Sequence, residues 1–218
     1  MRIGIYGGSF NPIHRGHTSL ASSLVRQRLV DEVWLMVSPQ NPLKVNACGT
    51  SHATHCGTSH TTYDDRVEMA RLATRDIRGV EVSDFERNLP CPSYTVTTLR
   101  ELSRTYPQHE FVLIIGEDNW QNFHRWYKAE EIITDYEVLV FHRTGCNIPP
   151  GTSGTLPNKA ASFVATKLYP ISSTEIRTRL ATVQQAEGAK SPEVWSCVKG
   201  MLNHRVLRYI LRHALYRD

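Results

Sequence analysis

The sequence contains no hydrophobic run long enough to cross a membrane. Its longest apolar stretches cover residues 33–37, 111–115 and 138–141, whereas a membrane-spanning helix needs roughly 20 such residues. The first residues also lack the apolar core of a secretory signal. We therefore expect a cytoplasmic protein that has no membrane partner.

Neither cysteine nor charge forms a pattern that defines a function. The 218 residues include five cysteines, an odd number that argues against a disulfide framework and predicts free thiols in a reducing compartment. With 25 basic and 21 acidic residues, the net charge is +4, and the basic residues are spread along the chain. This mild excess suits a small anionic ligand and does not indicate a nucleic acid partner.

Strand-like and helix-like segments alternate along the chain. Short apolar runs predict strands over residues 2–6, 32–38, 80–82, 110–115 and 137–142. Helical spacing predicts helices over 16–29, 63–75, 94–106 and 174–181, and a helical end from 191 that breaks near Gly200 and Asn203. In 32–38 both alternating sets of side chains are apolar, which is typical of a parallel strand covered on two faces.

This alternation predicts an α/β fold with a Rossmann-like, doubly wound and mainly parallel sheet. We assign the sheet to a core over residues 1–170 and a small helical part to residues 171–218. In such folds ligands bind beyond the carboxyl ends of the strands.

A tandem repeat interrupts the pattern. Residues 48–63 read C-G-T-S-H-A-T-H and then C-G-T-S-H-T-T-Y, without apolar periodicity, so we predict a surface loop inserted over residues 45–62. Cys48, His52, Cys56 and His60 recur at four-residue steps, and such ligands can bind zinc. The spacing matches no common zinc finger, however, and a duplication produces it automatically, so we expect no metal site.

The N-terminal segment 7–17 follows a predicted strand and opens a predicted helix. Gly7 and Gly8 allow backbone amides to approach an anion closely. The helix start adds free N–H groups and partial positive charge. His14 and His17, three residues apart, can both face that end as compact hydrogen-bond donors. These parts predict a polyphosphate cradle, which is neither the dinucleotide nor the P-loop motif.

Two segments resemble signatures of the nucleotidyltransferase superfamily. The sequence G-S-F-N-P-I-H-R-G-H at 8–17 is similar to G-x-F-D-P-x-H-x-G-H, although Asn11 replaces the acidic residue and so loses its charge. The second signature, I-S-S-T-x-x-R, occurs at 171–177. There Ser172 and Ser173 can cap a helix, and Arg177 lies one turn further on.

Three middle segments narrow the resemblance to the bacterial nicotinate-nucleotide adenylyltransferases. They are P-S-Y-T at 92–95, I-I-G-E-D at 114–118 and F-H-R-W-Y followed by E-I at 123–132. The resemblance runs from about residue 2 to 216 apart from the repeat. It implies transfer of the adenylyl group of ATP to nicotinate mononucleotide in NAD biosynthesis, giving nicotinate adenine dinucleotide and pyrophosphate. Mg²⁺ would arrive with ATP, because no acidic metal cluster is evident.

The resemblance also implies the roles of individual residues. The expected catalytic residues are His14, His17 and Arg177. The expected ATP-binding residues are these three with Gly7, Gly8, Ser9, Phe10, Lys44, Gly116, Ile171, Ser172 and Ser173. The expected mononucleotide-binding residues are Tyr94, Thr95, Asp118, Trp126 and Tyr127.

Other interpretations remain open. Trp126 alone could be a core residue, Asp118 a helix cap, Lys44 a solvated loop residue and Arg177 a member of a surface ion pair. The acceptor could be nicotinamide mononucleotide or a phosphopantetheine-like molecule. Asn11 and the repeat are the only features that favour a nucleotide-binding protein without catalysis. The sequence leaves homo-oligomerisation open.

Overall fold

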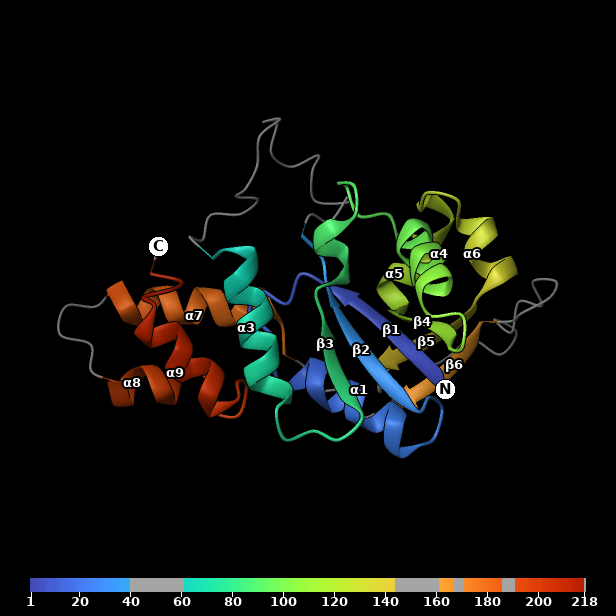
Figure 1. Ribbon diagram of the computed structural model, residues 1–218. Helices are drawn as coiled ribbons and strands as arrows, with labels where there is room; N and C mark the ends of the chain where they lie inside the picture. Colours follow the sequence, from blue (N-terminus) through green and yellow to red (C-terminus); the bar gives the residue numbers. More distant parts are fainter. Residues whose placement is uncertain (40–60, 144–160, 167–170, 186–190, 218) are drawn as a thin grey trace.

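The computed structural model describes residues 1–39, 61–143, 161–166, 171–185 and 191–217. These residues form one sheet of six strands in the order β3-β2-β1-β4-β5-β6, with every neighbouring pair parallel (Figure 1). The strands are β1 (Arg2–Gly8), β2 (Glu32–Val37), β3 (Val80–Ser83), β4 (Glu110–Gly116), β5 (Glu137–Arg143) and β6 (Ser162–Thr166).

Helices connect the strands and extend beyond them. The longer ones are α1 (Arg15–Arg26), α3 (Tyr63–Thr74), α4 (Thr95–Thr105), α7 (Ser173–Gln185) and α9 (His204–Arg212). The shorter ones are α5 (Glu117–Gln121), α6 (Ala129–Asp135), α8 (Ser191–Cys197) and the 3₁₀ turns η1 (Phe85–Asn88) and η2 (Phe123–Arg125).

Alternating side chains on each strand enter two separate hydrophobic cores. In β2, Val33 and Leu35 pack into the core that includes α1 and α3, whereas Met36 packs into the core beneath α4 and α6. In β4, Ile114 and Leu113 divide in the same way. A parallel strand needs apolar cover on both faces, and the two-sided pattern of residues 32–38 provides it. The predicted doubly wound α/β fold is therefore confirmed.

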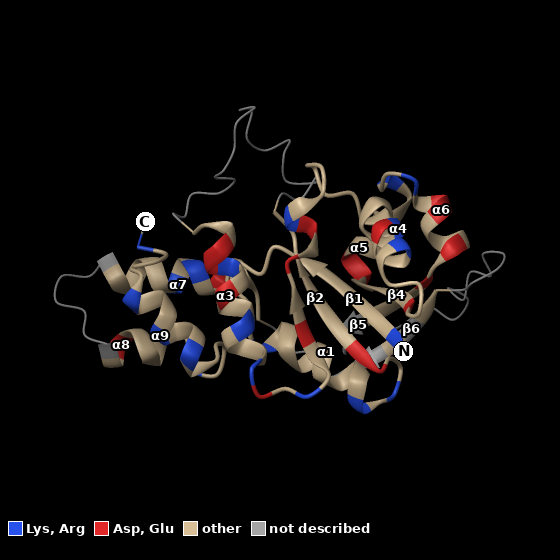
Figure 2. Ribbon diagram, in the orientation of Figure 1, with Lys and Arg blue, Asp and Glu red and all other residues tan. Residues whose placement is uncertain are grey.

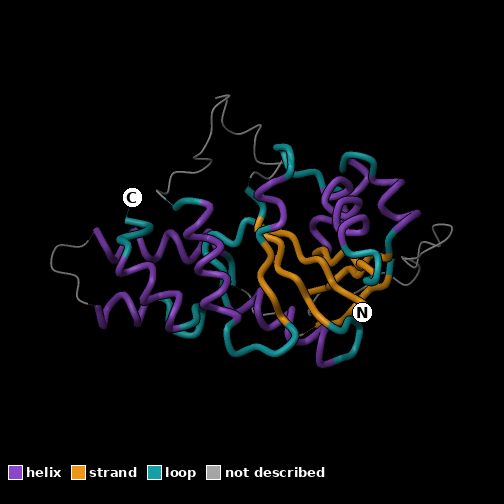
Figure 3. Tube along the Cα trace, viewed as in Figure 1, coloured by secondary structure: helices purple, strands orange, loops and turns teal. Residues whose placement is uncertain are grey.

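The strand order reverses at β1, which lies between β2 and β4. The chain runs outward from β1 through β2 to β3, and then returns to β4 on the other side of β1. Figure 3 shows helices on both sides of the sheet. At such a reversal the loops at the carboxyl ends of the strands diverge and leave a crevice.

The C-terminal helices α7, α8 and α9 pack beside α3 rather than over the centre of the sheet (Figure 1). Ile176 and Ile210 are fully buried in the core that α3 shares. Asn203 caps α9 by accepting a hydrogen bond from the Arg205 amide (2.9 Å), and Gly200 adopts a positive φ of 78°. The predicted break near these two residues is confirmed.

Several short elements were not among those predicted from the sequence: α5, the turns η1 and η2, and the elements β6 and α6. All are short, and β6 follows a stretch rich in glycine and proline, so none provides a clear periodicity. Lys44 and residues 48–60 of the tandem repeat lie outside the described residues, and so does Cys146. The end of the repeat is described, with Thr62 as the N-cap of α3 and Tyr63 as its first residue. Cys91 and Cys197 carry free thiols.

Charged residues lie mainly on the helices and at strand ends, while the centre of the sheet is uncharged (Figure 2). Among the described residues, no helix combines the length and the apolar character needed to cross a membrane.

We predict that Ile210→Ala lowers the free energy of unfolding by about 2–5 kcal/mol, because it removes a fully buried side chain from the α3–α9 contact. Urea denaturation would measure the change. Arg208→Ala, an exposed position on the same helix, is the matched control and should change the stability by no more than about 0.5 kcal/mol. Equal effects of the two substitutions would contradict the assigned packing.

Candidate active site

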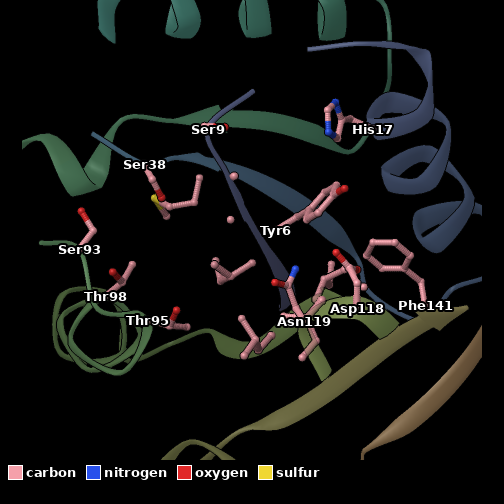
Figure 4. Close-up of a pocket in the computed structure, with 18 of the residues that line it drawn as sticks. Tyr6, Ser9, His17, Ser38, Ser93, Thr95, Thr98, Asp118, Asn119 and Phe141 are labelled. Atoms are coloured by element: carbon pink, nitrogen blue, oxygen red, sulfur yellow. The ribbon is translucent and has the colours of Figure 1, made fainter. Parts of the chain in front are cut away.

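A cavity of about 510 Å³ opens at the carboxyl ends of β1, β2 and β4, where the strand order reverses. Its walls come from the loop after β1, the start of α1, the start of α4, the β4–α5 junction, the segment around Trp126 and the start of α7. Figure 4 shows Ser38, Ser93, Thr95 and Thr98 on one side, with His17 and Phe141 on the other. The sequence motifs at 7–17, 92–95, 114–118, 123–132 and 171–177 thus all contribute residues to this cavity.

His14 and His17 together form the N-terminal cap of α1. The Nδ1 atom of His14 accepts a hydrogen bond from the Gly16 amide (3.1 Å), and the Nδ1 atom of His17 accepts one from the His14 amide (3.2 Å). The two rings stack with their centroids 3.7 Å apart. This is a reciprocal capping box in which two imidazoles take the places usually held by a hydroxyl and a carboxamide.

These hydrogen bonds determine the chemistry of both rings. Because each Nδ1 is an acceptor, the proton of the neutral ring lies on Nε2, which is then a donor. Loss of water contact and the neighbouring His14 lower the pKa of His17 well below its usual value. At neutral pH, His17 therefore offers an uncharged N–H donor at the wall of the cavity.

The loop 9–13 between β1 and α1 is held by side chains that are distant in sequence. Arg66 of α3 donates to the Ser9 carbonyl (2.8 Å), and Ser173 of α7 donates to the Pro12 carbonyl (2.9 Å). Asn11 is held twice. Its carbonyl accepts from Arg177 Nη1 (2.6 Å), and its Oδ1 accepts from the Tyr216 hydroxyl. Three carbonyl oxygens of the loop are thus paired within the protein.

Two glycines around the cavity lie close to neighbouring side chains. A Cβ at Gly8 would lie 3.0 Å from the ring of Phe10, a residue that is buried and has a positive φ of 45°. A Cβ at Gly116 would lie 2.5 Å from Asp118 Oδ1. Space is open at Gly7, whose backbone lines the cavity, so a ligand can approach it closely.

Aromatic side chains surround the other half of the cavity. The rings of Tyr94 and Tyr127 lie 4.7 Å apart, and both residues are exposed. Trp126 packs against Phe123 (5.2 Å), while its buried Nε1 atom has no hydrogen-bond partner among the described residues. Trp126 is therefore both a packing residue and part of the cavity wall.

The N-terminus of α4 also faces this half. Tyr94 occupies the N-cap position and provides no side-chain hydrogen bond, so the first amides of α4 lack a side-chain cap. Ser93 and Thr95, on either side of the cap, line the cavity. A helix start without a cap favours an anionic group at this point.

Comparison with known proteins agrees with this geometry. The cytidylyltransferase-like family model matches residues 5–179. A probable nicotinate-nucleotide adenylyltransferase of Bacteroides thetaiotaomicron is 40% identical over 206 residues, covering 94% of this chain and 95% of that protein. This chain belongs to the nicotinate-nucleotide adenylyltransferase family. Another member, from Flavobacterium johnsoniae, is 34% identical over 200 residues, covering 91% and 96% of the two chains.

A solved structure from the nicotinate-nucleotide adenylyltransferase family has the same fold. The nicotinic acid mononucleotide adenylyltransferase of Plasmodium falciparum, complexed with NaAD, superposes with a TM-score of 0.72 at 17% sequence identity. The superposition covers 99% of this chain and 97% of that one.

Most of the residues expected from the family resemblance lie together around the cavity. Its lining includes Gly7, Gly8, Ser9, His14, His17, Tyr94, Thr95, Gly116, Asp118, Trp126, Tyr127, Ile171, Ser172 and Ser173. Phe10 packs in the core and Arg177 is bonded to Asn11 and Thr174, so neither lines the cavity. Lys44 lies outside the described residues.

A polar group on the α4 side of the cavity was not predicted from the sequence. Ser38, Glu86, Ser93 and Thr98 all line the cavity. The first two follow β2 and β3, so their position after predicted parallel strands was a usable signal. Across the described ranges, no group of three or more His, Cys, Asp or Glu side chains is arranged to hold a metal ion.

We predict that His17 makes the stability of the protein depend on pH. Because the folded-state pKa lies below the usual 6.5, the unfolded chain binds a proton that the folded chain does not, and stability is lost as the pH falls below about 6.5. His17→Gln keeps an acceptor for the His14 amide but removes the titration. Its stability, measured by urea denaturation, should fall less steeply, by up to about 1.4 kcal/mol per pH unit. Identical slopes would contradict the assigned state.

Proposed function

We propose that the protein transfers the adenylyl group of ATP to nicotinate mononucleotide, forming nicotinate adenine dinucleotide and pyrophosphate. One observation supports this most strongly: a single cavity contains the two-histidine cap of α1 and the uncapped start of α4. The first suits phosphate oxygens and the second suits an acidic ring substituent. The names of the relatives and the NaAD complex of the P. falciparum enzyme support the same assignment.

The ATP phosphates lie between α1 and α7 in this proposal. The Nε2–H groups of His14 and His17 donate to phosphate oxygens, with His17 nearest the bridging oxygen. Ser172 Oγ accepts from the Glu175 amide (3.1 Å), as a capping residue of α7 does. Arg177 binds the Asn11 carbonyl and so positions the loop 9–13, and its remaining N–H groups are proposed to donate to phosphate oxygens. Lys44 is proposed as a further phosphate ligand.

The mononucleotide occupies the aromatic half. Trp126 stacks with the pyridine ring, Tyr94 and Tyr127 flank it, and the first amides of α4 near Thr95 receive the ring carboxylate. Asp118 accepts hydrogen bonds from ribose hydroxyls. This arrangement directs the mononucleotide phosphate towards the start of α1, where the α-phosphate of ATP lies.

The reaction needs no nucleophile from the protein. A phosphate oxygen of the mononucleotide attacks the α-phosphorus in line, the bond to the bridging oxygen breaks, and pyrophosphate leaves. The protein positions both substrates and stabilises the charge that develops on the leaving group. We propose Mg²⁺ as the divalent ion. Among the described residues around the cavity acidic ligands are scarce, which fits an ion carried by the triphosphate, where it would neutralise the leaving pyrophosphate.

The reaction is tested by pyrophosphate release from ATP and Mg²⁺, with nicotinate mononucleotide, nicotinamide mononucleotide or phosphopantetheine as the acceptor. We expect release with the first and a clear preference for it over the second, because amide donors at a helix start favour a carboxylate. A reaction without any acceptor is the control. Preference for nicotinamide mononucleotide or phosphopantetheine would contradict the proposed acceptor. Absence of pyrophosphate release with all three acceptors would contradict the proposed activity.

We further predict that His17→Gln lowers kcat by about 10²–10³-fold and changes the KM values much less. The variant keeps the cap of α1 but loses the donor at the leaving group. Steady-state kinetics with both substrates varied would measure the effect. Near-normal turnover would exclude His17 from the transition state.

A further inference from the structure

Glu86 is a buried carboxyl that the proposed reaction does not use. It lies on η1, directly after β3, has an exposed fraction of 5% and lines the cavity. Its Oε1 atom accepts a hydrogen bond from the Thr98 hydroxyl (2.8 Å). Its Oε2 atom is buried and has no partner with hydrogen-bond geometry among the described residues. The Ser93 hydroxyl, on a residue that is 8% exposed, also lacks a partner with full hydrogen-bond geometry, although it and the Ser38 hydroxyl lie close enough to interact with the Glu86 carboxyl.

No cation compensates this carboxyl within the part of the chain that the structure describes. Arg87, the next residue, pairs with Asp64 and lies over the ring of Tyr63. The guanidinium of Arg66 is occupied by three backbone carbonyls. Tyr63 of α3 interacts with the charge of Glu86, but its own pKa is raised to about 12, so it stays neutral over the ordinary pH range.

The surroundings of Glu86 therefore favour its neutral form. Burial raises the pKa of the Glu86 carboxyl, and the hydroxyls of Thr98, Ser38 and Ser93 offset only part of that effect. A neutral carboxyl can donate a hydrogen bond through its second oxygen, whereas a carboxylate can only accept. Within the cavity, the carboxylate would also repel another anion.

The position of Glu86 beside α4 relates its protonation state to binding of the acceptor substrate. Thr98 lies one turn after Thr95 on α4, and Ser93 immediately precedes the N-cap residue. Glu86 thus lies beside the helix start to which the proposed function assigns the acidic ring substituent. Figure 4 shows Ser93, Thr95 and Thr98 at this helix start. We propose that Glu86 is a specificity-determining residue, whose neutral acid form admits an acceptor with an anionic ring substituent and whose ionisation opposes that acceptor. This inference rests on the proposed function.

The test compares wild type with Glu86→Gln over a pH series that spans the Glu86 pKa, which lies above the usual value of a glutamate. Gln retains an acceptor for Thr98 and places a permanent donor at the second position. With wild type, the ratio of kcat/KM for nicotinate mononucleotide to that for nicotinamide mononucleotide should fall as the pH rises, by up to about tenfold per pH unit above the Glu86 pKa. The fall should come from KM of the acidic acceptor. With Glu86→Gln, the ratio should be independent of pH.

Glu81→Gln, an exposed position on β3, is the matched control and should behave as wild type. A second readout does not need activity: below the Glu86 pKa, wild type should show the infrared carbonyl band of a buried neutral carboxylic acid, and Glu86→Gln should lack it. The same pH dependence of the ratio in both proteins, or the absence of that band, would overturn the proposal. If wild type used neither acceptor, the proposed function would fail first, and this role with it.

Discussion

The loop 9–13 is the part of the structure on which the rest of the site depends. It contains a non-glycine residue at positive φ, Phe10, and its carbonyls lie at the end of a central strand, where they cannot join the sheet. Buried carbonyls without partners would cost free energy. Ser9, Asn11 and Pro12 instead receive donors from α3 and α7, while Tyr216 binds the Asn11 side chain.

This pairing also has an electrostatic effect. Carbonyl oxygens near a triphosphate would repel it, whereas carbonyls already bonded to arginine and serine donors present less negative potential. The helical part after residue 171 therefore does more than cover the core. It brings Ser173, Arg177 and Tyr216 to the loop, over sequence separations of 161, 166 and 205 residues. A substitution in these helices can thus reach the phosphate site through the loop, without contacting a substrate.

The two histidines combine structural and chemical roles in the same atoms. Their Nδ1 atoms complete the cap of α1, and for that reason their Nε2 atoms carry the protons. Protonation of His17 on Nδ1 would remove a cap bond, which is consistent with its lowered pKa. A neutral donor suits a site that must release pyrophosphate, because it stabilises developing charge without holding the product as tightly as a permanent cation would.

The sequence predicted those features that depend on local patterns. The two-sided apolar strands, the glycine turn after β1 and the helix that opens at His14 all follow from spacing within a few residues. The segments around Tyr94, Gly116, Trp126 and Ser172 came from the family resemblance, and the sheet topology explains why they meet. Parallel strands bring their carboxyl ends to one edge.

What the sequence could not predict depends on contacts between distant segments. Nothing near Arg177 indicates that its partner is the Asn11 carbonyl, and the motif alone suggested a phosphate ligand. In the sequence, Glu86 lies in a short stretch of mixed polarity and resembles a surface residue. Its burial depends on segments that are distant in sequence, such as α4, whose Thr98 donates a hydrogen bond to it. The uncharged side chain at Asn11 can be interpreted only from the structure, in which the Tyr216 hydroxyl donates a hydrogen bond to Asn11 Oδ1.

The cavity has two halves with different charge requirements, one at α1 and α7 and the other at α4. In the proposed function, the half at α1 and α7 attracts a polyphosphate with helix starts, neutral imidazole donors and paired carbonyls. The half at α4 must distinguish one ring substituent from another, which is a difference of a single group. In the role proposed for Glu86, a carboxyl placed there is compatible with an anionic substituent only while it is neutral. Its burial without a cation among the described residues therefore favours an acidic acceptor. In this proposal, the selectivity for the ring substituent depends on the burial of Glu86 on η1 as well as on the residues that contact the substituent.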